Sequence, residues 1–166
     1  SGATLTNASF TQAVASKADF GKAELGDANF SGATLEEASF VEAAALGADF
    51  SNAQMPSAKL SGATLTKASF AQAAAAQADF GKAELDDATF SSATLAEASF
   101  VEAAAPRADF SQAKATMADF SKAELSDATF TGARLEQASF VEATAPRADF
   151  SQAHMPSATL SGATLT

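Results

Sequence analysis

The stretch ADFGKAELGDANFSG at residues 18–32 contains the pattern that decides the fold of this chain. Alanine returns every five residues, and the residue two places after each alanine is Phe or Leu. The alanine period continues without a gap beyond this stretch, because Ala occupies every position ending in 3 or 8 from Ala3 to Ala163. All 14 Phe stand at positions divisible by five. The chain is therefore one uninterrupted repeat array.

A five-residue period excludes both an α-helix and a flat strand. A five-residue step advances about 500° around a helix and spreads the apolar side chains over its whole circumference. In a flat strand an odd step would move each repeat to the opposite face. Within one repeat, Ala and the residue two places later face the same side, and the remaining polar residues favour an exposed turn. The pattern thus predicts short extended segments joined by corners, with the apolar side chains directed inward.

A longer period of 20 residues sets the size of one coil. Phe occupies every twentieth position from Phe10 to Phe150, and the series that starts at Phe20 holds Phe except at Leu60 and Leu160. The two remaining series hold only Leu, Ala and Met. We therefore expect about eight coils of 20 residues with four sides, two opposite sides carrying Phe. A coil spacing of about 4.8 Å would stack successive rings.

Composition excludes several classes of protein. Leu, Val and Phe together are about 18% of the chain and Ile is absent, which is typical of disorder unless Ala fills a narrow interior. The absence of Cys removes disulfides and thiolate sites, and a single His removes a multi-histidine zinc site. No apolar run is long enough for a membrane helix. A formal net charge of -10 argues against direct nucleic-acid binding.

The units ATLTN (3–7), ASFTQ (8–12), ADFGK, AELGD and ANFSG resemble the A(D/N)LXX units of pentapeptide-repeat proteins. The resemblance implies an all-β fold, a right-handed four-sided β-helix, that covers residues 1–166 as a single domain with no linker or capping helix. The best understood members of that family resemble the DNA duplex in shape and charge. They bind type II topoisomerases and protect gyrase from quinolones.

The chain also contains a longer repeat in addition to the five-residue and 20-residue periods. The segment SNAQMPSAKLSGATLT at 51–66 recurs in similar form as SQAHMPSATLSGATLT at 151–166. The offset is a whole number of coils, which fits duplication of a natural chain or deliberate consensus design. Neither end carries a helix signal or a charge cluster. Because uncapped β-coils expose unpaired N–H and C=O groups, we expect self-association through the coil ends.

Residues 20 apart should lie side by side in neighbouring coils, and their charges alternate. One such series runs Lys67, Asp87, Arg107, Asp127, Arg147, and another pairs Lys22 with Glu42, Lys82 with Glu102 and Lys122 with Glu142. We expect these pairs to set the register between coils, because each exposed pair contributes only about 0.2–1 kcal/mol.

Carboxylates outside these pairs are the candidate partner-binding surface. They are Asp49, Asp109 and Asp149 on one Phe side, Asp19, Asp79 and Asp119 on the other, and Glu24, Glu84 and Glu124, with Asp27 and Asp86, on a Leu side. Lys114, Arg134 and His154 share one series, which we interpret as a solvated strip rather than an anion site.

No catalytic, cofactor or metal site is expected. Ser111 and Lys114 fit an SxxK pattern, but they lie on a β-coil and we attribute the match to chance. The sequence predicts a non-enzymatic scaffold rod, natural or consensus-designed, whose faces bind a protein partner or whose ends assemble. The alternative is an acidic DNA mimic that binds gyrase. Scattered Thr do not form the regular columns of an ice-binding surface. With no targeting signal, the default expectation is a soluble cytoplasmic protein.

Overall fold

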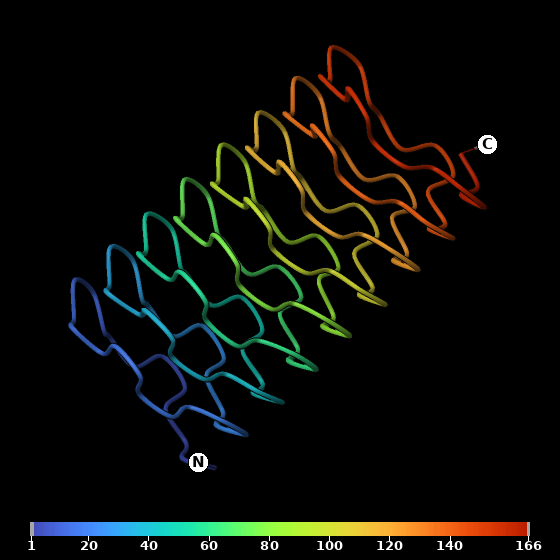
Figure 1. Ribbon diagram of the computed structural model, residues 1–166. Coiled ribbons are helices and arrows are strands. Elements are labelled where there is room, and N and C mark those ends of the chain that lie inside the picture. The colour runs from blue at the N-terminus through green and yellow to red at the C-terminus, as the bar shows by residue number, and fades with distance from the viewer. Residues whose placement is uncertain (1, 166) are drawn as a thin grey trace.

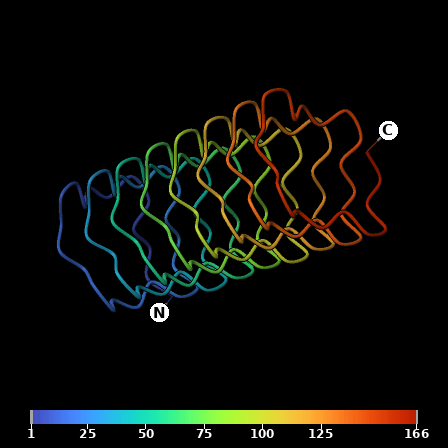
Figure 2. The same cartoon turned by 45° about the horizontal axis from the view of Figure 1, so that its top comes forward.

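The computed structural model describes residues 2–165, which form a right-handed four-sided β-helix (Figures 1 and 2). The coils stack along one axis and the two termini lie at opposite ends of the rod (Figure 1). Each regular element is a single bridge residue at a position ending in 4 or 9. Every bridge is parallel and joins residues 20 apart, from Thr4↔Glu24 to Thr144↔Thr164. The predicted coil length and four-sided fold are confirmed.

Backbone hydrogen bonds follow the same five-residue rule throughout the rod. The N–H of Leu65 donates to the carbonyl of Glu84 in the next coil at 2.7 Å, and the N–H of Thr64 donates to the carbonyl of Ala43 in the preceding coil at 2.9 Å. At the corner, the N–H of Lys67 donates to the next coil at 2.8 Å and that of Ala68 donates to Leu65 at 2.9 Å. Four of the five N–H groups in this repeat are thus bonded to backbone oxygens.

The fifth N–H belongs to the first corner residue, and this explains where proline is tolerated. All four prolines occupy this position, at Pro56, Pro106, Pro146 and Pro156. Proline lacks an N–H, and its fixed φ suits the second residue of a β-turn. No ladder bond is lost there.

The second corner residue always has a positive φ. At 33 corners, 27 non-glycine residues have φ between 53° and 61° and six glycines lie between 64° and 73°. Left-handed backbone costs a non-glycine residue about 1 kcal/mol, and only Asn and Asp among the other types adopt it readily. The coil geometry imposes this conformation on residues such as Lys, Glu and Met. The sequence predicted a turn here but not this strain.

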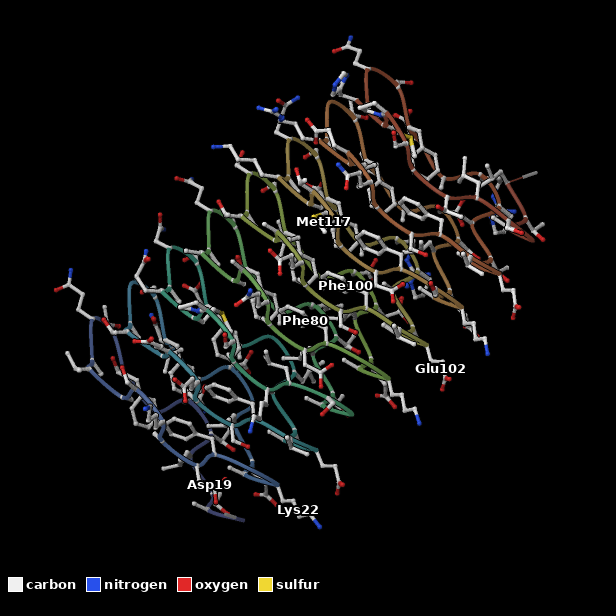
Figure 3. The ribbon with its side chains drawn as sticks, viewed as in Figure 1. Asp19, Lys22, Phe80, Phe100, Glu102 and Met117 are labelled. Carbon is white, nitrogen blue, oxygen red and sulfur yellow. The ribbon has the colours of Figure 1, made fainter. Side chains whose placement is uncertain are left out.

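The core is built from the inward alanines and the residue two places after each. From Ala23 to Ala145 these side chains are buried, so alanine is a core residue as predicted. Phe rings in successive coils stack with centroids 4.7–5.0 Å apart, and rings from the two Phe sides meet edge to face at 5.2–5.7 Å. Phe80 and Phe100 lie inside the coils in Figure 3. Leu60 is buried in the same column and interrupts the ring stack.

Candidate interaction surface

Four outward faces run along the rod, one for each bridge series, and we name each after one residue. The Asp49 face comprises Ser9, Asn29, Asp49, Ser69, Thr89, Asp109, Thr129 and Asp149. The opposite Asp19 face comprises Asp19, Ser39, Lys59, Asp79, Ser99, Asp119, Ser139 and Thr159. The Glu24 face comprises Thr4, Glu24, Ala44, Thr64, Glu84, Ala104, Glu124, Thr144 and Thr164. The Lys114 face comprises Val14, Thr34, Gln54, Ala74, Thr94, Lys114, Arg134 and His154.

The nine candidate carboxylates at bridge positions therefore lie on three separate faces, Asp27 and Asp86 lie at corners, and the set does not form one cluster. Even within a face they are spread out, since Asp109 and Asp149 are two coils apart, as are Glu84 and Glu124. Two coils correspond to about 10 Å. A partner that used these carboxylates would have to follow one face along the rod.

The aspartates on the two Phe sides also have a structural role that the sequence reasoning missed. Each accepts a hydrogen bond from the N–H two residues later, which is the corner N–H left out of the backbone ladder. The donors are Gly21 to Asp19, Ser51 to Asp49, Gly81 to Asp79, Ser111 to Asp109, Ser121 to Asp119 and Ser151 to Asp149, at 2.8–2.9 Å. Asn29 accepts the N–H of Ser31 in the same way at 2.8 Å. An Asp or Asn placed two residues before the corner could have signalled this Asx turn.

Asp149 accepts more hydrogen bonds than the turn bond alone. Its Oδ2 also accepts the hydroxyl of Thr131 at 2.9 Å. Hydrogen bonds from the side chain and N–H of Ser151, and then from Thr131, hold the pKa of Asp149 below its usual value. Asp149 therefore acts as a turn acceptor and as a surface charge at once.

The glutamates of the Glu24 face make fewer side-chain hydrogen bonds than the aspartates of the two Phe sides. Glu24 accepts the hydroxyl of Thr4 at 3.1 Å. The side-chain carboxylates of Glu84 and Glu124 have no hydrogen-bond or ion-pair partner within residues 2–165. Of the candidate carboxylates at bridge positions, these two are the most available to a partner, and the exposed corner residue Asp27 likewise has no side-chain partner within residues 2–165.

Two corner columns hold the predicted ion pairs, except that Lys67 forms none within residues 2–165. Lys22 lies 3.4 Å from Glu42, Lys82 lies 3.7 Å from Glu102, and Lys122 lies 3.9 Å from Glu142. Figure 3 shows Lys22 and Glu102 projecting outward along one edge of the rod. The pairs are exposed, so they add little stability and mainly disfavour a shifted register.

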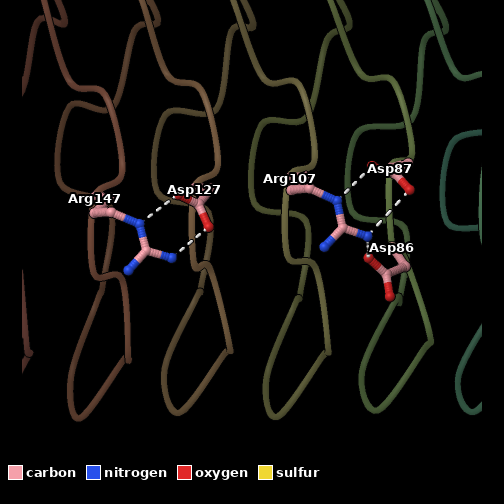
Figure 4. A network of polar contacts seen from close by, with 5 residues as sticks. All are labelled: Asp86, Asp87, Arg107, Asp127 and Arg147. Atoms are coloured by element: carbon pink, nitrogen blue, oxygen red, sulfur yellow. Dashed lines mark hydrogen bonds and ion pairs between the residues drawn. The ribbon is translucent and has the colours of Figure 1, made fainter.

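In the second column, which runs from Lys67 to Arg147, two arginines each donate through two guanidinium nitrogens to one aspartate (Figure 4). Nε and Nη2 of Arg107 donate to Asp87 at 2.8 and 3.1 Å, and Nη2 also contacts Asp86. Arg147 donates to Asp127 at 2.7 and 2.6 Å. The prediction that Asp86 is unpaired was wrong, because the guanidinium reaches the adjacent corner residue as well as the one in its own column. Hydrogen bonds from Arg107 and Arg147 lower the pKa of Asp87 and Asp127 respectively.

The Lys114 face carries a different arrangement. Nε and Nη2 of Arg134 donate to Oε1 of Glu136 at 3.0 and 2.9 Å, and Nε2 of His154 lies 4.0 Å from the same oxygen. Thr116 donates its hydroxyl to Oε2 of Glu136 at 3.0 Å. The carboxyl's own backbone N–H, then Arg134 and Thr116, lower the pKa of Glu136. Glu136 is thus held as a carboxylate on the edge of this face.

Concave sites are absent from the described part of the chain. Residues 2–165 enclose no pocket and contain no group of three side chains arranged to hold a metal ion. The same residues include no helix capable of crossing a membrane. Any recognition by the described surface would use its faces, corners or ends.

Comparison with known families accounts for the whole chain. Models described as "Pentapeptide repeats (9 copies)", "Pentapeptide repeats (8 copies)" and "Pentapeptide repeat region" match residues 1–44, residues 28–66 with 135–166, and residues 63–140. The chain belongs to the pentapeptide-repeat family. Members of this family are generally non-catalytic. No curated protein matches its sequence significantly.

Solved pentapeptide-repeat structures have a similar fold. One is a protein of the Arabidopsis thaliana thylakoid lumen, 32% identical over 57% of this chain and 66% of its own, with a TM-score of 0.55. HetL of Nostoc sp. strain PCC 7120, involved in heterocyst differentiation regulation, is 28% identical over 98% of this chain and 86% of its own, with a TM-score of 0.35. QnrB1, a plasmid-mediated fluoroquinolone resistance protein, is 16% identical over 100% of this chain and 92% of its own, with a TM-score of 0.41. The last two superpositions are too loose to support a functional parallel.

Proposed function

We propose that this pentapeptide-repeat chain is a non-enzymatic scaffold, a rigid rod that presents its faces to a protein partner and joins other copies through its ends. The observation that supports the proposal most directly is the unbroken hydrogen-bonded ladder of parallel bridges from Thr4 to Thr164 around a core without a pocket. Each coil contacts only its neighbours, as in other solenoids, so the surface extends linearly with the number of coils.

The Glu24 face is the part of this surface best suited to a protein partner. Glu84 and Glu124 are available carboxylates about two coils apart, on a chain with a net charge of -10. A partner would therefore present basic side chains spaced about 10 Å apart, and the interaction would weaken with added salt.

The ends provide the second mode of association. In the first coil of the 166-residue chain, the N–H groups of Ser9 and Val14 have no backbone partner within residues 2–165. In the last coil, the N–H groups of Phe150 and Met155 are in the same situation. Open β-edges of this kind pair readily with another chain.

Sedimentation of the 166-residue chain over a range of concentrations tests the end-to-end mode. We expect species larger than the monomer to grow with concentration. The double variant Ser9→Pro, Val14→Pro removes two edge N–H groups that form no internal bond, so it should stay folded by circular dichroism and associate less. A strict monomer at high concentration, for the unmodified chain, would refute end-to-end joining.

A gyrase-binding DNA mimic is the second candidate function, supported by carboxylate rows on three sides of an acidic rod. A duplex as long as this rod, about 40 Å, carries about 23 phosphate charges. Here the net charge is only -10, and eight acidic side chains are in ion pairs within residues 2–165: Glu37, Glu42, Asp86, Asp87, Glu102, Asp127, Glu136 and Glu142. The scaffold is therefore the better supported function.

A supercoiling assay with purified gyrase distinguishes the two candidates. If the chain does not inhibit supercoiling even at many-fold molar excess over gyrase, the DNA-mimic function is excluded. If inhibition occurs, the triple variant Asp49→Asn, Asp109→Asn, Asp149→Asn tests its cause. Asn29 already accepts a corner N–H at 2.8 Å, so these amides can keep the turns while removing three charges. Inhibition by a mimic should weaken in this variant.

A further inference from the structure

Charges on neighbouring coils obey one rule almost everywhere on this rod. A charged side chain has an opposite charge or an uncharged residue as its in-register neighbour in the adjacent coils. The corner series Lys67, Asp87, Arg107, Asp127, Arg147 alternates in sign, and no acid on the bridge faces of residues 2–165 has another acid as its bridge partner. Directly opposed like charges destabilise a sheet, so this pattern is the one expected of a solvated surface.

The Lys114 face breaks the rule once, at its C-terminal end. Lys114 bridges to Arg134, and Arg134 bridges to His154. Backbone hydrogen bonds fix this register, since the N–H of Arg134 donates to Ala113 at 2.9 Å and that of Ala115 donates to Arg134 at 2.8 Å. Neighbouring coils lie about 4.8 Å apart. Within residues 2–165 this is the one place where two permanent cations are bridge partners.

The local carboxylate only partly offsets this repulsion. The side chain of Glu136 is only 16% exposed to solvent, and its carboxylate already accepts hydrogen bonds from Arg134 and Thr116. No ion pair involves Lys114 within the described residues. Lys59 provides a contrast, because its bridge partners are Ser39 and Asp79. Lys114 is thus a cation with another cation beside it and no carboxylate of its own.

The sequence alone favours a solvated strip here, but the fixed register and the absence of an ion pair at Lys114 within residues 2–165 argue for another role. We propose that Lys114, Arg134 and His154 form a binding site for a phosphate or sulfate oxyanion. A tetrahedral oxyanion has several acceptor oxygens, so it can accept from donors on adjacent coils and remove their repulsion. Arg134 donates two of its five N–H groups to Glu136, so three remain for a ligand. Lys114 supplies up to three more, and the His154 ring lies at the end of the same strip, 66% exposed. This proposal is independent of the scaffold function, because it concerns three side chains on one face.

A titration with inorganic phosphate, followed by amide chemical shifts in NMR, tests the site. We expect saturable shifts at residues 113–115, 133–135 and 153–155. Sulfate should produce the same pattern. O-phosphoserine then distinguishes the source of the anion, since equal affinity indicates that the oxyanion alone is recognised and tighter binding indicates one carried on a protein. Both results support the site.

Three variants make the experiment specific. Lys114→Ala should weaken phosphate binding about tenfold, as expected for loss of a charged hydrogen bond, yet raise the melting temperature by removing like-charge repulsion. Glu136→Gln should tighten binding, because it removes the competing carboxylate from Arg134. Lys59→Ala is the matched control and should leave binding unchanged.

The proposal is overturned if phosphate causes no saturable shift in these three segments, or if Lys114→Ala and Lys59→Ala bind phosphate equally well. A Glu136→Gln variant that remains folded and binds less tightly would also contradict it. None of these outcomes depends on the association state measured by sedimentation, so this site and the end-to-end mode can fail separately.

Discussion

Replacing Phe100 by Leu should measure what the ring stack adds to the stability of the rod. Phe100 is buried, and its ring stacks on Phe80 and Phe120 with centroids 4.8 Å apart. It also meets Phe90 and Phe110 edge to face at 5.4 Å. Leu60, two coils earlier in the same column, shows that leucine fits this position of the coil. The substitution therefore removes four ring contacts, and the backbone of the coil can keep its shape.

The magnitude follows from these four contacts. An aromatic pair contributes about 0.5–1.5 kcal/mol beyond the burial of its surface. Leucine recovers most of the apolar burial, since large apolar side chains differ little in that term. Four such pairs sum to about 2–6 kcal/mol. Phe→Ala costs about 3–5 kcal/mol in other cores, and leucine retains more burial than alanine, so we expect the free energy of unfolding to fall by about 2–4 kcal/mol.

Guanidinium unfolding followed by far-UV circular dichroism is the direct assay, because the chain has no Trp or Tyr for fluorescence. A double-mutant cycle of Phe80→Leu with Phe100→Leu should give a coupling of about 0.5–1.5 kcal/mol. Phe80→Leu with Phe140→Leu is the control, since these rings are three coils apart and their effects should add. A loss below about 1 kcal/mol for Phe100→Leu, or additivity in the contacting pair, would refute a ring contribution beyond burial.

Three further predictions follow from the corners. Met117→Gly should raise the free energy of unfolding by about 1 kcal/mol in chemical denaturation, because φ at Met117 is 58° and its side chain is 53% exposed. An unchanged free energy of unfolding would mean that the left-handed corner is not strained. Ser91→Pro should be tolerated, whereas Ser92→Pro should lower the stability by about 3 kcal/mol or more. The reason is that Ser92 has φ 59° and its N–H donates to the carbonyl of Ser111 in the next coil at 2.9 Å. Equal melting temperatures of the two variants would contradict this. Arg147 lowers the pKa of Asp127, so the stability from this pair is complete above the ordinary aspartate pKa of about 3.9 and is lost as the pH falls through the lower folded value. Arg147→Gln should therefore show a smaller drop in melting temperature below pH 4 than the unmodified chain.

Part of the candidate surface could be predicted because charge and register are both periodic. Once the coil length of 20 was known, the pairs Lys22 with Glu42 and Lys82 with Glu102 followed from counting. Asp86 could not be assigned in this way, because its contact with Arg107 depends on where a flexible guanidinium reaches across two corner positions. The Asx turns were missed because the open corner N–H becomes visible only when all other backbone donors have been placed.

The sequence by itself determined the architecture of this pentapeptide-repeat protein. Ala recurs at every fifth position and Phe at every tenth, interrupted only in one column, and a narrow four-sided coil directs these periodic side chains into one core. The tertiary structure alone decided the backbone of the corners, where 27 non-glycine residues take a left-handed φ. It also decided which carboxylates remain available, and that Glu136 bonds to Arg134 while Lys114 has no ion pair within residues 2–165. These outcomes depend on hydrogen bonds between coils and on side-chain reach, which a list of residue types does not contain.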